Sequence, residues 1–441
     1  MILRPLLPAI VTALLPAIAP LANAEVRLPK ILASHMVVQR DRPIHIWGWS
    51  DPGERVSVAL KDATQSAVAD ELGRWSVDLP QQPAGGPFQI TASASTRIVL
   101  DDVLIGDVWF ASGQSNMEMP LRGFPPSALV TNGAEEIAHA NHPDIRLLNI
   151  GRKASSVPLT DFDAEGRQQN QGASPTWTVC SPETVASFSA AAYFFGRDLA
   201  EKEHVPIGLI DSTWGGTPAE AWTSLEGLAA DWGLMPVFAA RAHMMNERAE
   251  LPLVMESEKR ADAAAKRANR TPPEHPWRPD PESWAPGELF NGMVAPALGF
   301  QIKGVIWYQG ESNTDSERAP LYAKLFPALI ADWRAHWREG IFPFLFVQIA
   351  NFKAGEQQTW PVVREAQRRT LSLANTAMAV TIDIGNPDNV HPSDKQTVGA
   401  RLALAARALA YGENVEYSGP RFRRSASAVR LRISLAADER G

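Results

Sequence analysis

The sequence predicts an α/β domain that is preceded by a small all-β region, and three observations support this. From about residue 101 to residue 411, buried-looking apolar stretches alternate with helical patterns, which is typical of a parallel sheet with helices on both faces. From residue 25 to about residue 100, short alternating stretches lie between turn residues, and this spacing predicts a small N-terminal β-sandwich. The chain has 441 residues, more than one typical domain requires.

In the N-terminal region, the strands that we expect are 44–49, 55–60, 74–79 and 88–92. In the α/β region, the expected strands are 103–110, 145–148, 207–210, 305–307, 344–348 and 378–382, and the expected helices are 190–203, 321–337, 362–374 and 395–410. An insertion over 225–287 is predicted to be helical from 239 to 270, apart from Pro252, and then irregular because it is rich in proline. Residues 412–441 form a short tail in which 427–435 alternate like one strand.

The first 24 residues predict a signal peptide. Arg4 is the only charged side chain before Glu25, residues 6–21 are apolar, and residues 22–24 fit a small-x-small cleavage site. A membrane anchor is less favoured, because the apolar run is short and contains three prolines. We therefore expect a periplasmic or secreted protein, with no membrane span after the signal is removed.

The composition excludes several classes of function. The formal net charge is −7 and like charges do not form blocks, which argues against nucleic acid as a partner. Cys180 is the single cysteine, so no intramolecular disulfide can form and a cysteine-based metal site is disfavoured. The chain has 14 Trp and only 5 Tyr; Trp rings stack on sugars but also fill cores, and we favour the core for most of them.

Four polar stretches follow expected strands of the α/β region. They are Gly113–Met117 (GQSNM), Ile210–Thr217 (IDSTWGGT), Trp307–Asn313 (WYQGESN) and Asp388–Pro392 (DNVHP). Active sites of parallel sheets lie beyond the carboxyl ends of the strands. A serine, a glycine pair, an amide-rich turn and an Asp-x-x-His sequence, in this order, together predict acyl transfer.

Ser115 is the candidate nucleophile of this chemistry, although a serine on a turn often has only a structural role. A serine needs a base to take its proton, and His391 is the one histidine that follows a strand-end loop with a nearby carboxylate. By itself, His391 fits a structural loop histidine equally well. Asp388 could orient the imidazole of His391 and stabilise its charged form. No cofactor is expected, because a triad needs none and no metal cluster or phosphate loop is present in the sequence.

The oxyanion of the tetrahedral intermediate needs preorganised donors. The backbone N–H of Ser115 and that of Gly215 or Gly216 can provide two of them. We expect a side-chain amide to provide the third, and Gln309 is preferred over Asn313 because Gln309 ends its strand. Gln114, beside the nucleophile, is expected to bind the oxyanion or the substrate.

These stretches resemble the blocks of SGNH hydrolases and, more closely, those of the sialate O-acetylesterase family. The resemblance covers about residues 27–420 and is carried by HMVVQRDRPIHIWGWSDPGERVSV, DVWFASGQSNMEMP, LFNGMVAPALGFQIKGVIWYQGESN and IDIGNPDNVHPSDKQTVG. It implies a flavodoxin-like three-layer core behind an N-terminal β domain, with Ser115 as nucleophile, His391 as base and Asp388 as the acid. The third block departs from the Gly-x-Asn-Asp form of the superfamily, and the chain stops where longer relatives continue into another β segment.

The leading interpretation is therefore a secreted serine esterase that removes O-acetyl groups from carbohydrate, with O-acetylated sialic acid as the substrate that the resemblance implies. An acetylesterase of plant polysaccharide, such as acetylated xylan, is the first alternative. A non-catalytic sugar-binding protein on a hydrolase scaffold is the second. Ser115, Asp388 and His391 occurring together argue against the second alternative.

Overall fold

The structure is a computed structural model, and it describes residues 25–162, 176–275, 278, 280–355, 358–426 and 432–436. The expected signal peptide, residues 1–24, lies outside the described residues. None of the helices in the described ranges is long and apolar enough to cross a membrane.

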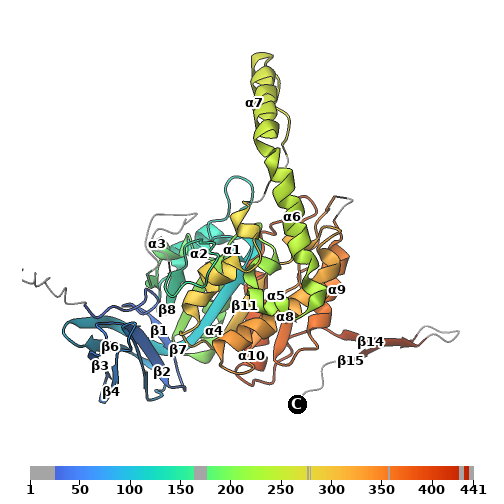
Figure 1. Ribbon diagram of the computed structural model, residues 1–441. Coiled ribbons are helices and arrows are strands. Elements are labelled where there is room, and N and C mark those ends of the chain that lie inside the picture. Colours follow the sequence, from blue (N-terminus) through green and yellow to red (C-terminus); the bar gives the residue numbers. More distant parts are fainter. Residues whose placement is uncertain are drawn as a thin grey trace, which may run out of the picture.

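A parallel sheet forms the centre of the molecule (Figure 1). Its strands lie in the order β13-β12-β11-β7-β10-β8-β9, in which every neighbouring pair is parallel except β8 and β9. Their bounds are β7 (Arg97–Gly113), β8 (His142–Asn149), β9 (Thr178–Cys180), β10 (Ile207–Thr213), β11 (Gly304–Tyr308), β12 (Phe344–Val347) and β13 (Thr376–Ala379). All residues of β10, β11, β12 and β13 are buried, as expected for strands whose two faces are both covered.

Helices cover both faces of this sheet (Figure 1). One face is covered by α4 (Ala190–Glu203) and α10 (Lys395–Leu409), and the opposite face by α8 (Ala319–Trp337) and α9 (Trp360–Thr370). A separate apolar core forms on each face. The predicted α/β architecture is confirmed, and α4 has the bounds that the sequence predicted.

The N-terminal region contains six further strands. They are β1 (Val37–Gln39), β2 (Ile44–Trp49), β3 (Arg55–Leu60), β4 (Ala63–Val68), β5 (Arg74–Leu79) and β6 (Gly85–Ser93). Strands β2 and β5 pair with each other, whereas β3 pairs with β4 and β6, and β6 pairs with the first half of β7. Strand β7 therefore runs without a break through the domain boundary that we expected near residue 100.

The insertion contains the helices that its sequence predicted. Helix α5 (Leu225–Ala229) lies against the body, whereas α6 (Pro236–Ala249) and α7 (Leu251–Arg267) form an arm that projects from it (Figure 1). Pro252 lies in the first turn of α7, where proline removes no helical hydrogen bond. The short helices α1 (Ser115–Glu118), α2 (Gly133–His139) and α3 (Pro182–Val185) complete the α/β region.

The C-terminal tail differs from the one strand that we expected over 427–435. Residues 427–431 lie outside the described part of the chain. The described residues form β14 (Arg421–Ala426) and β15 (Arg432–Ala436), which pair as antiparallel strands. The sequence analysis missed β14, which is the partner of the expected strand.

Candidate active site

Ser115 lies just beyond the carboxyl end of β7, whose neighbours in the sheet are β10 and β11. The turn before it depends on Gly113, which has a φ of +136°, and a Cβ there would collide with the carbonyl of Tyr308 on β11. The N–H of Gln114 donates to the same carbonyl over 3.0 Å. Because the chain passes so close to β11, only glycine fits at position 113.

Gln114 connects this turn to the loop after β11. Its side-chain carbonyl accepts the N–H groups of Gly310 at 3.4 Å and Ser312 at 3.1 Å. The amide orientation is thereby fixed, and the NH₂ end of Gln114 remains available as a donor. Gln114 is buried and lines the candidate cavity, so it is well placed for the binding role that the sequence predicted.

Asn116 is held on both sides by charged groups that the sequence analysis did not assign. Its Nδ2 donates to Glu311 Oε1 at 2.6 Å and to the carbonyl of Val390 at 3.0 Å. Its Oδ1 accepts a hydrogen bond from Lys395 Nζ at 2.6 Å. Residues from the turn after β11, from α10 and from the loop before α10 thus fix the residue next to Ser115.

Burial changes the protonation of these two charged groups. It lowers the pKa of Lys395 to about 7, although Glu311 and Asp394 oppose this shift. It raises the pKa of Glu311, against the stabilising hydrogen bond from Asn116. The second carboxyl oxygen of Glu311, Oε2, is buried without a hydrogen-bond partner among the described residues, which leaves an unused acceptor at the cavity wall.

His391 lies on the loop that precedes α10, next to Val390 of this network. Its ring makes an edge contact with Phe124, with centroids 5.4 Å apart, and its backbone N–H donates to Asn389 Oδ1 at 2.9 Å. Burial and the positive charge of Lys395 lower the pKa of His391 to about 4. His391 is therefore neutral at pH 7, the protonation state that a general base requires.

Ser115 and His391 line one cavity of about 730 Å³, together with Gln114, Gly215 and Gly216. In the described part of the chain, no hydrogen bond joins the Ser115 hydroxyl to the His391 ring. Catalytic hydrogen bonds are often long before substrate binds, so the two side chains can share a cavity without yet being hydrogen-bonded to each other.

Asp388 differs from its expected arrangement. It is exposed, and its backbone N–H donates to Asn386 Oδ1 at 2.9 Å. Its carboxylate makes no hydrogen bond to His391 within the described residues. The physical reason is the local turn, in which Asn386 and Asn389 form a bridge and Asp388 lies at the exposed tip.

The side-chain amides of Gln309 and Asn313 do not line the cavity, contrary to their expected oxyanion role. Gln309 Nε2 donates to Asn313 Oδ1 at 2.7 Å, and Gln309 Oε1 accepts from the Tyr322 hydroxyl at 3.0 Å. Asn313 Nδ2 donates to Glu220 at 2.8 Å. Both residues are fully buried, so they brace the loop after β11 instead of facing a substrate.

Of the glycine pair Gly215 and Gly216, only one backbone N–H can donate to an oxyanion in this structure. Gly215 N–H donates to Glu118 Oε2 at 2.8 Å, which removes it as an oxyanion donor in this structure. Within the described residues, the N–H groups of Ser115 and Gly216 donate to no acceptor. The carbonyl of Gly216 accepts the Trp284 indole N–H at 2.6 Å, so this loop is fixed beside the nucleophile.

Two arginines line the same cavity, and the sequence analysis missed both. Arg152 forms an ion pair with Glu118, and burial lowers the pKa of Arg152 to about 10. Arg318 donates to Glu220 at 3.1 Å and to Asp315 at 3.1 Å, and its guanidinium lies 4.6 Å from the centre of a Trp284 ring. The aromatic residues that line the cavity are Phe124, Trp284, Phe352 and Trp360.

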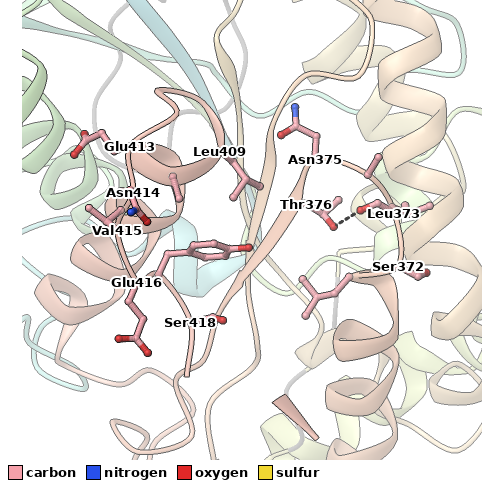
Figure 2. A pocket seen from close by; sticks show the side chains of 14 residues that line it. Ser372, Leu373, Asn375, Thr376, Leu409, Glu413, Asn414, Val415, Glu416 and Ser418 are labelled. Atoms are coloured by element: carbon pink, nitrogen blue, oxygen red, sulfur yellow. Dashed lines mark hydrogen bonds between the residues drawn. The ribbon is translucent and has the colours of Figure 1, made fainter. Parts of the chain in front are cut away.

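A second cavity of similar volume, about 720 Å³, lies beside the edge strand β13. Figure 2 shows its lining, in which the Thr376 hydroxyl donates to the carbonyl of Leu373 at 2.8 Å. Thr376 begins β13, so this cavity lies at the amino end of the strand rather than at the carboxyl end. It contains neither a serine–histidine pair nor an arginine. Chemistry, and not size, therefore singles out the cavity at Ser115.

Among the described residues, no group of three or more His, Cys, Asp or Glu side chains is arranged to hold a metal ion. The single cysteine, Cys180, is buried, and burial raises its pKa to about 12. It is therefore a protonated thiol at neutral pH and a poor nucleophile.

Three comparisons with known proteins show which proteins this chain is similar to. A family model described as "Carbohydrate esterase, sialic acid-specific acetylesterase" matches residues 277–408. Sialate O-acetylesterase from Rattus norvegicus is 32% identical over 429 residues, covering 89% of this chain and 75% of the relative. The human sialate O-acetylesterase is 32% identical over 427 residues, covering 89% and 73%.

Among solved structures, a novel carbohydrate acetylesterase from Xanthomonas citri is similar, with a TM-score of 0.74 and 35% identity. The similarity covers 91% of this chain and 79% of that chain. The parallel α/β fold, the serine–histidine cavity and these similarities define an esterase of the carbohydrate esterase class. Within that class, the chain belongs to the sialate O-acetylesterase family.

Proposed function

We propose that the protein is a serine esterase that hydrolyses O-acetyl groups on carbohydrate, with O-acetylated sialic acid as its substrate. The observation that carries the proposal is that Ser115 and a neutral His391 line one cavity together with Arg152 and Arg318. The relatives named sialate O-acetylesterase support the substrate.

In the proposed reaction, the Ser115 hydroxyl attacks the acetyl carbonyl while His391 takes its proton. The tetrahedral intermediate then collapses, the sugar oxygen leaves with the proton from His391, and the acetyl group remains on Ser115. A water molecule next attacks the acetyl-enzyme, again with His391 as base, and releases acetate. No cofactor takes part in these steps.

The oxyanion is stabilised by donors that differ in part from those expected from the sequence. We assign the backbone N–H groups of Ser115 and Gly216, together with the side-chain NH₂ of Gln114. Each belongs to a residue that lines the cavity, and the amide of Gln114 is held in place by two backbone N–H groups. Preorganised donors of this kind provide the largest single contribution in acyl transfer.

Two carboxylates compete for the role of orienting His391. The proposal keeps Asp388, which is three residues away on the same loop and reaches the imidazole once that loop turns inward around substrate. Glu311 is the competitor, because it is buried in the cavity wall with one unused oxygen. The variant, Asp388→Asn or Glu311→Gln, that lowers kcat more identifies the carboxylate that orients His391.

The lining of the cavity is consistent with an acidic sugar. The guanidinium groups of Arg152 and Arg318 can contact a sugar carboxylate, since arginine matches carboxylate geometry with paired N–H donors. The rings of Trp284 and Trp360 offer apolar faces to the sugar. Three carboxylates, those of Glu118, Glu311 and Asp315, line the cavity as well, so the arginines are partly neutralised before substrate arrives.

Acetate release from O-acetylated sialic acid and from acetylated xylan tests this proposal. We expect a higher kcat/KM on the sialic acid. Faster hydrolysis of acetylated xylan would contradict the sialate assignment while leaving the esterase in place. Absence of acetate release from both substrates and from p-nitrophenyl acetate would contradict the esterase itself and favour the sugar-binding alternative.

We also propose the finer architecture and the location. When β8, which pairs in parallel on the outer side of β10, is set aside, strands β10-β7-β11-β12-β13 lie in the order 2-1-3-4-5. This is the flavodoxin-like order, and it supports a three-layer SGNH core over 101–411. Residues 25–100 are proposed to be a small β-sandwich, and 1–24 a signal peptide that directs the protein to the periplasm or the exterior. Sequencing the amino terminus of the exported protein tests the last point, with Glu25 expected as its first residue.

A further inference from the structure

A groove of about 460 Å³ lies where the β2–β5 pair meets the α/β body, away from the residues that line the catalytic cavity. No residue lines both cavities. The β2–β5 pair contributes the aromatic and polar side chains of the groove, and the body contributes small or apolar residues. The groove is lined by His45, Trp47, Gly48, Trp49, Asp70, Arg74, Trp75, Ser76, Leu159, Thr160, Ala295, Pro296 and Gly299.

The alternation of β2 places three of these rings on one face. His45, Trp47 and Trp49 are half-buried, whereas Ile44 and Ile46, which alternate with them along the strand, are buried in the core. Successive side chains of a strand point to opposite faces, so the three rings share the outer face. The strand therefore separates its core residues from a row of partly accessible aromatic rings.

Polar side chains of β5 lie directly beside these rings. In the antiparallel register, Ser76 lies opposite Trp47 and Arg74 lies opposite Trp49, and opposite residues of such a pair share a face. Arg74 and Asp70 are exposed, and they form an ion pair at 2.8 Å. Hydrogen-bonding groups and flat aromatic rings thus alternate along one groove.

The rings are held in place before any ligand arrives. His45 stacks on Trp47 with centroids 5.3 Å apart and an interplanar angle of 24°, and Asp78 Oδ1 accepts a hydrogen bond from His45 Nδ1 at 2.8 Å. A Cβ at Gly299 would lie only 2.9 Å from the Trp47 ring, so this glycine allows the body to pack against Trp47. Rigid aromatic side chains bind with little loss of conformational entropy.

From this arrangement we propose a second glycan-binding site, in which Trp47 and Trp49 stack on pyranose units of the glycan that carries the acetyl groups. Pyranose rings have apolar C–H faces and an equator of hydroxyl groups. The aromatic faces can pack against the C–H faces of the sugar. The side chains of Arg74, Asp70 and Ser76 can form hydrogen bonds with its hydroxyl groups. The inference deepens the proposed function, because it rests on carbohydrate as the substrate class.

The position of the groove suits one glycan that reaches both cavities. Arg152 lines the catalytic cavity, and Leu159 and Thr160 line the groove. Since only seven residues lead from Arg152 to Leu159, their Cα atoms lie at most about 25 Å apart. A short oligosaccharide can span such a distance, which would hold an acetylated chain near Ser115 between turnovers.

The alternative is that these rings only stabilise the packing of the β2–β5 pair against the α/β body. Trp75 has that role already, since it is 4% exposed and lies on the inner face of β5. Trp47 and Trp49 remain half-buried after packing, so each residue keeps surface that a ligand can reach. His45 stacks on Trp47, and the Arg27 guanidinium lies 5.8 Å from the centroid of a Trp49 ring, so a ligand would use the remaining surface of each ring. A purely structural role would affect stability without changing the affinity for glycan.

The test compares three variants with one control. Trp49→Ala and Trp47→Ala remove a ring, whereas Ser76→Trp fills the groove without removing any contact. Trp232→Ala is the control, because Trp232 is 85% exposed and lines neither cavity. Each protein is assayed on p-nitrophenyl acetate, on O-acetylated mucin glycans and on acetylated xylan, and its melting temperature is recorded.

We expect the groove variants to raise KM on at least one of the two glycans by about tenfold, as typical for a Trp that anchors a ligand. Their kcat/KM on p-nitrophenyl acetate and the values of Trp232→Ala should match those of the wild type. Unchanged KM on both glycans for Trp49→Ala and Ser76→Trp would overturn the second site, even if melting temperatures fall. Loss of p-nitrophenyl acetate hydrolysis in Ser115→Ala is a separate result, so failure of the catalytic proposal remains distinguishable.

Discussion

The two halves of the candidate active site are held very differently. On the Ser115 side, buried groups fix each residue of the turn: Tyr308 faces Gly113, backbone N–H groups hold Gln114, and Glu311 and Lys395 clamp Asn116. On the His391 side, residues 386–388 are exposed. Asn389 donates to the carbonyl of Ser127 at 2.9 Å, and the carbonyls of Pro387 and Val390 accept from Lys353 N–H and from Asn116, each at 3.0 Å.

This difference suggests a division of labour within the site. Buried and satisfied polar networks rigidify the groups that they hold, so the proposed nucleophile and the proposed oxyanion donors are preorganised. Residues 386–388, which precede His391 on its loop, are exposed, and exposed segments with few buried contacts open most easily. We infer that substrate binding adjusts His391 and Asp388 toward a fixed Ser115, rather than the reverse.

The largest expected effect comes from removing either the proposed nucleophile or the proposed base. Ser115→Ala should lower kcat on acetylated sugar by at least about a thousandfold, and His391→Ala should do the same. The double variant should be little worse than either single variant, because nucleophile and base act as one unit. Steady-state kinetics on one acetyl ester measures all three.

The control for this set is Ser127→Ala. Ser127 lines the same cavity but is exposed, and its hydroxyl donates to the carbonyl of Phe124 at 2.9 Å. It should retain activity within severalfold of the wild type. Multiplicative losses in the double variant, or an active His391→Ala, would remove His391 from the mechanism.

A smaller effect distinguishes the two carboxylates. If an inward turn of the exposed loop brings Asp388 to His391, Asp388→Asn should lower kcat about a hundredfold, which is milder than loss of the base. Glu311→Gln keeps the shape and should cost less than tenfold, because Gln can still accept the hydrogen bond from Asn116. A larger loss of kcat in Glu311→Gln than in Asp388→Asn would assign the orienting role to Glu311. The carboxylate that orients His391 would then belong to the buried network on the Ser115 side.

The pH profile probes the contact between the two sides. Below its pKa of about 4, protonated His391 cannot accept the serine proton, so activity should persist well below pH 6.5. Lys395→Met removes one of the two causes that lower this pKa. The acidic limb of kcat/KM should therefore move upward, toward pH 6.5, whereas Lys353→Met at an exposed position should leave it in place. An unshifted limb in Lys395→Met would show that Lys395 does not act on His391.

The same shift affects folding with a defined sign. The folded-state pKa of His391, about 4, lies below the usual value of 6.5. Between these values the unfolded chain binds a proton that the folded chain does not, so His391 should reduce the free energy of unfolding as the pH falls from 6.5 to 4. Urea unfolding of the wild type and His391→Ala across this range should show a smaller pH dependence in the variant.

The smallest expected effect concerns the tail. Among the described residues, β14 and β15 pair only with each other, and an isolated two-stranded hairpin is marginally stable. Deleting residues 421–441 should leave kcat/KM unchanged and shift the melting temperature by less than about 2 °C, because few contacts of the core are lost. A loss of soluble protein would show that the tail packs on the body.

The sequence predicted those parts of this molecule that depend on local pattern. Helix 190–203 and the buried strand at 207–210 follow from periodicity alone. Ser115 and His391 were identified because each follows a strand end in a polar motif. Periodicity was weaker for β13, which occupies 376–379 rather than 378–382, because a buried apolar run has no marked end.

The partners of the polar side chains could not be predicted in the same way. Gln309 and Asn313 had the right residue types for an oxyanion hole, but each satisfies its amide within the framework. Lys395 and Glu311 were in the quoted motifs but received no role, since charged residues are rarely buried unless paired. Their connection through Asn116 joins positions 195 and 279 residues apart, which no local pattern reports.

The central claim, that Ser115 is a preformed nucleophile activated by His391, is tested most directly with diethyl p-nitrophenyl phosphate. In the expected reaction, Ser115 Oγ bonds to phosphorus and p-nitrophenolate leaves, so inactivation should parallel release of one equivalent of nitrophenolate. Peptide mass mapping should place the diethylphosphoryl group on Ser115, and His391→Ala should be labelled at least about a hundredfold more slowly. Complete inactivation with the label on another residue, or equally fast labelling of His391→Ala, would contradict the account.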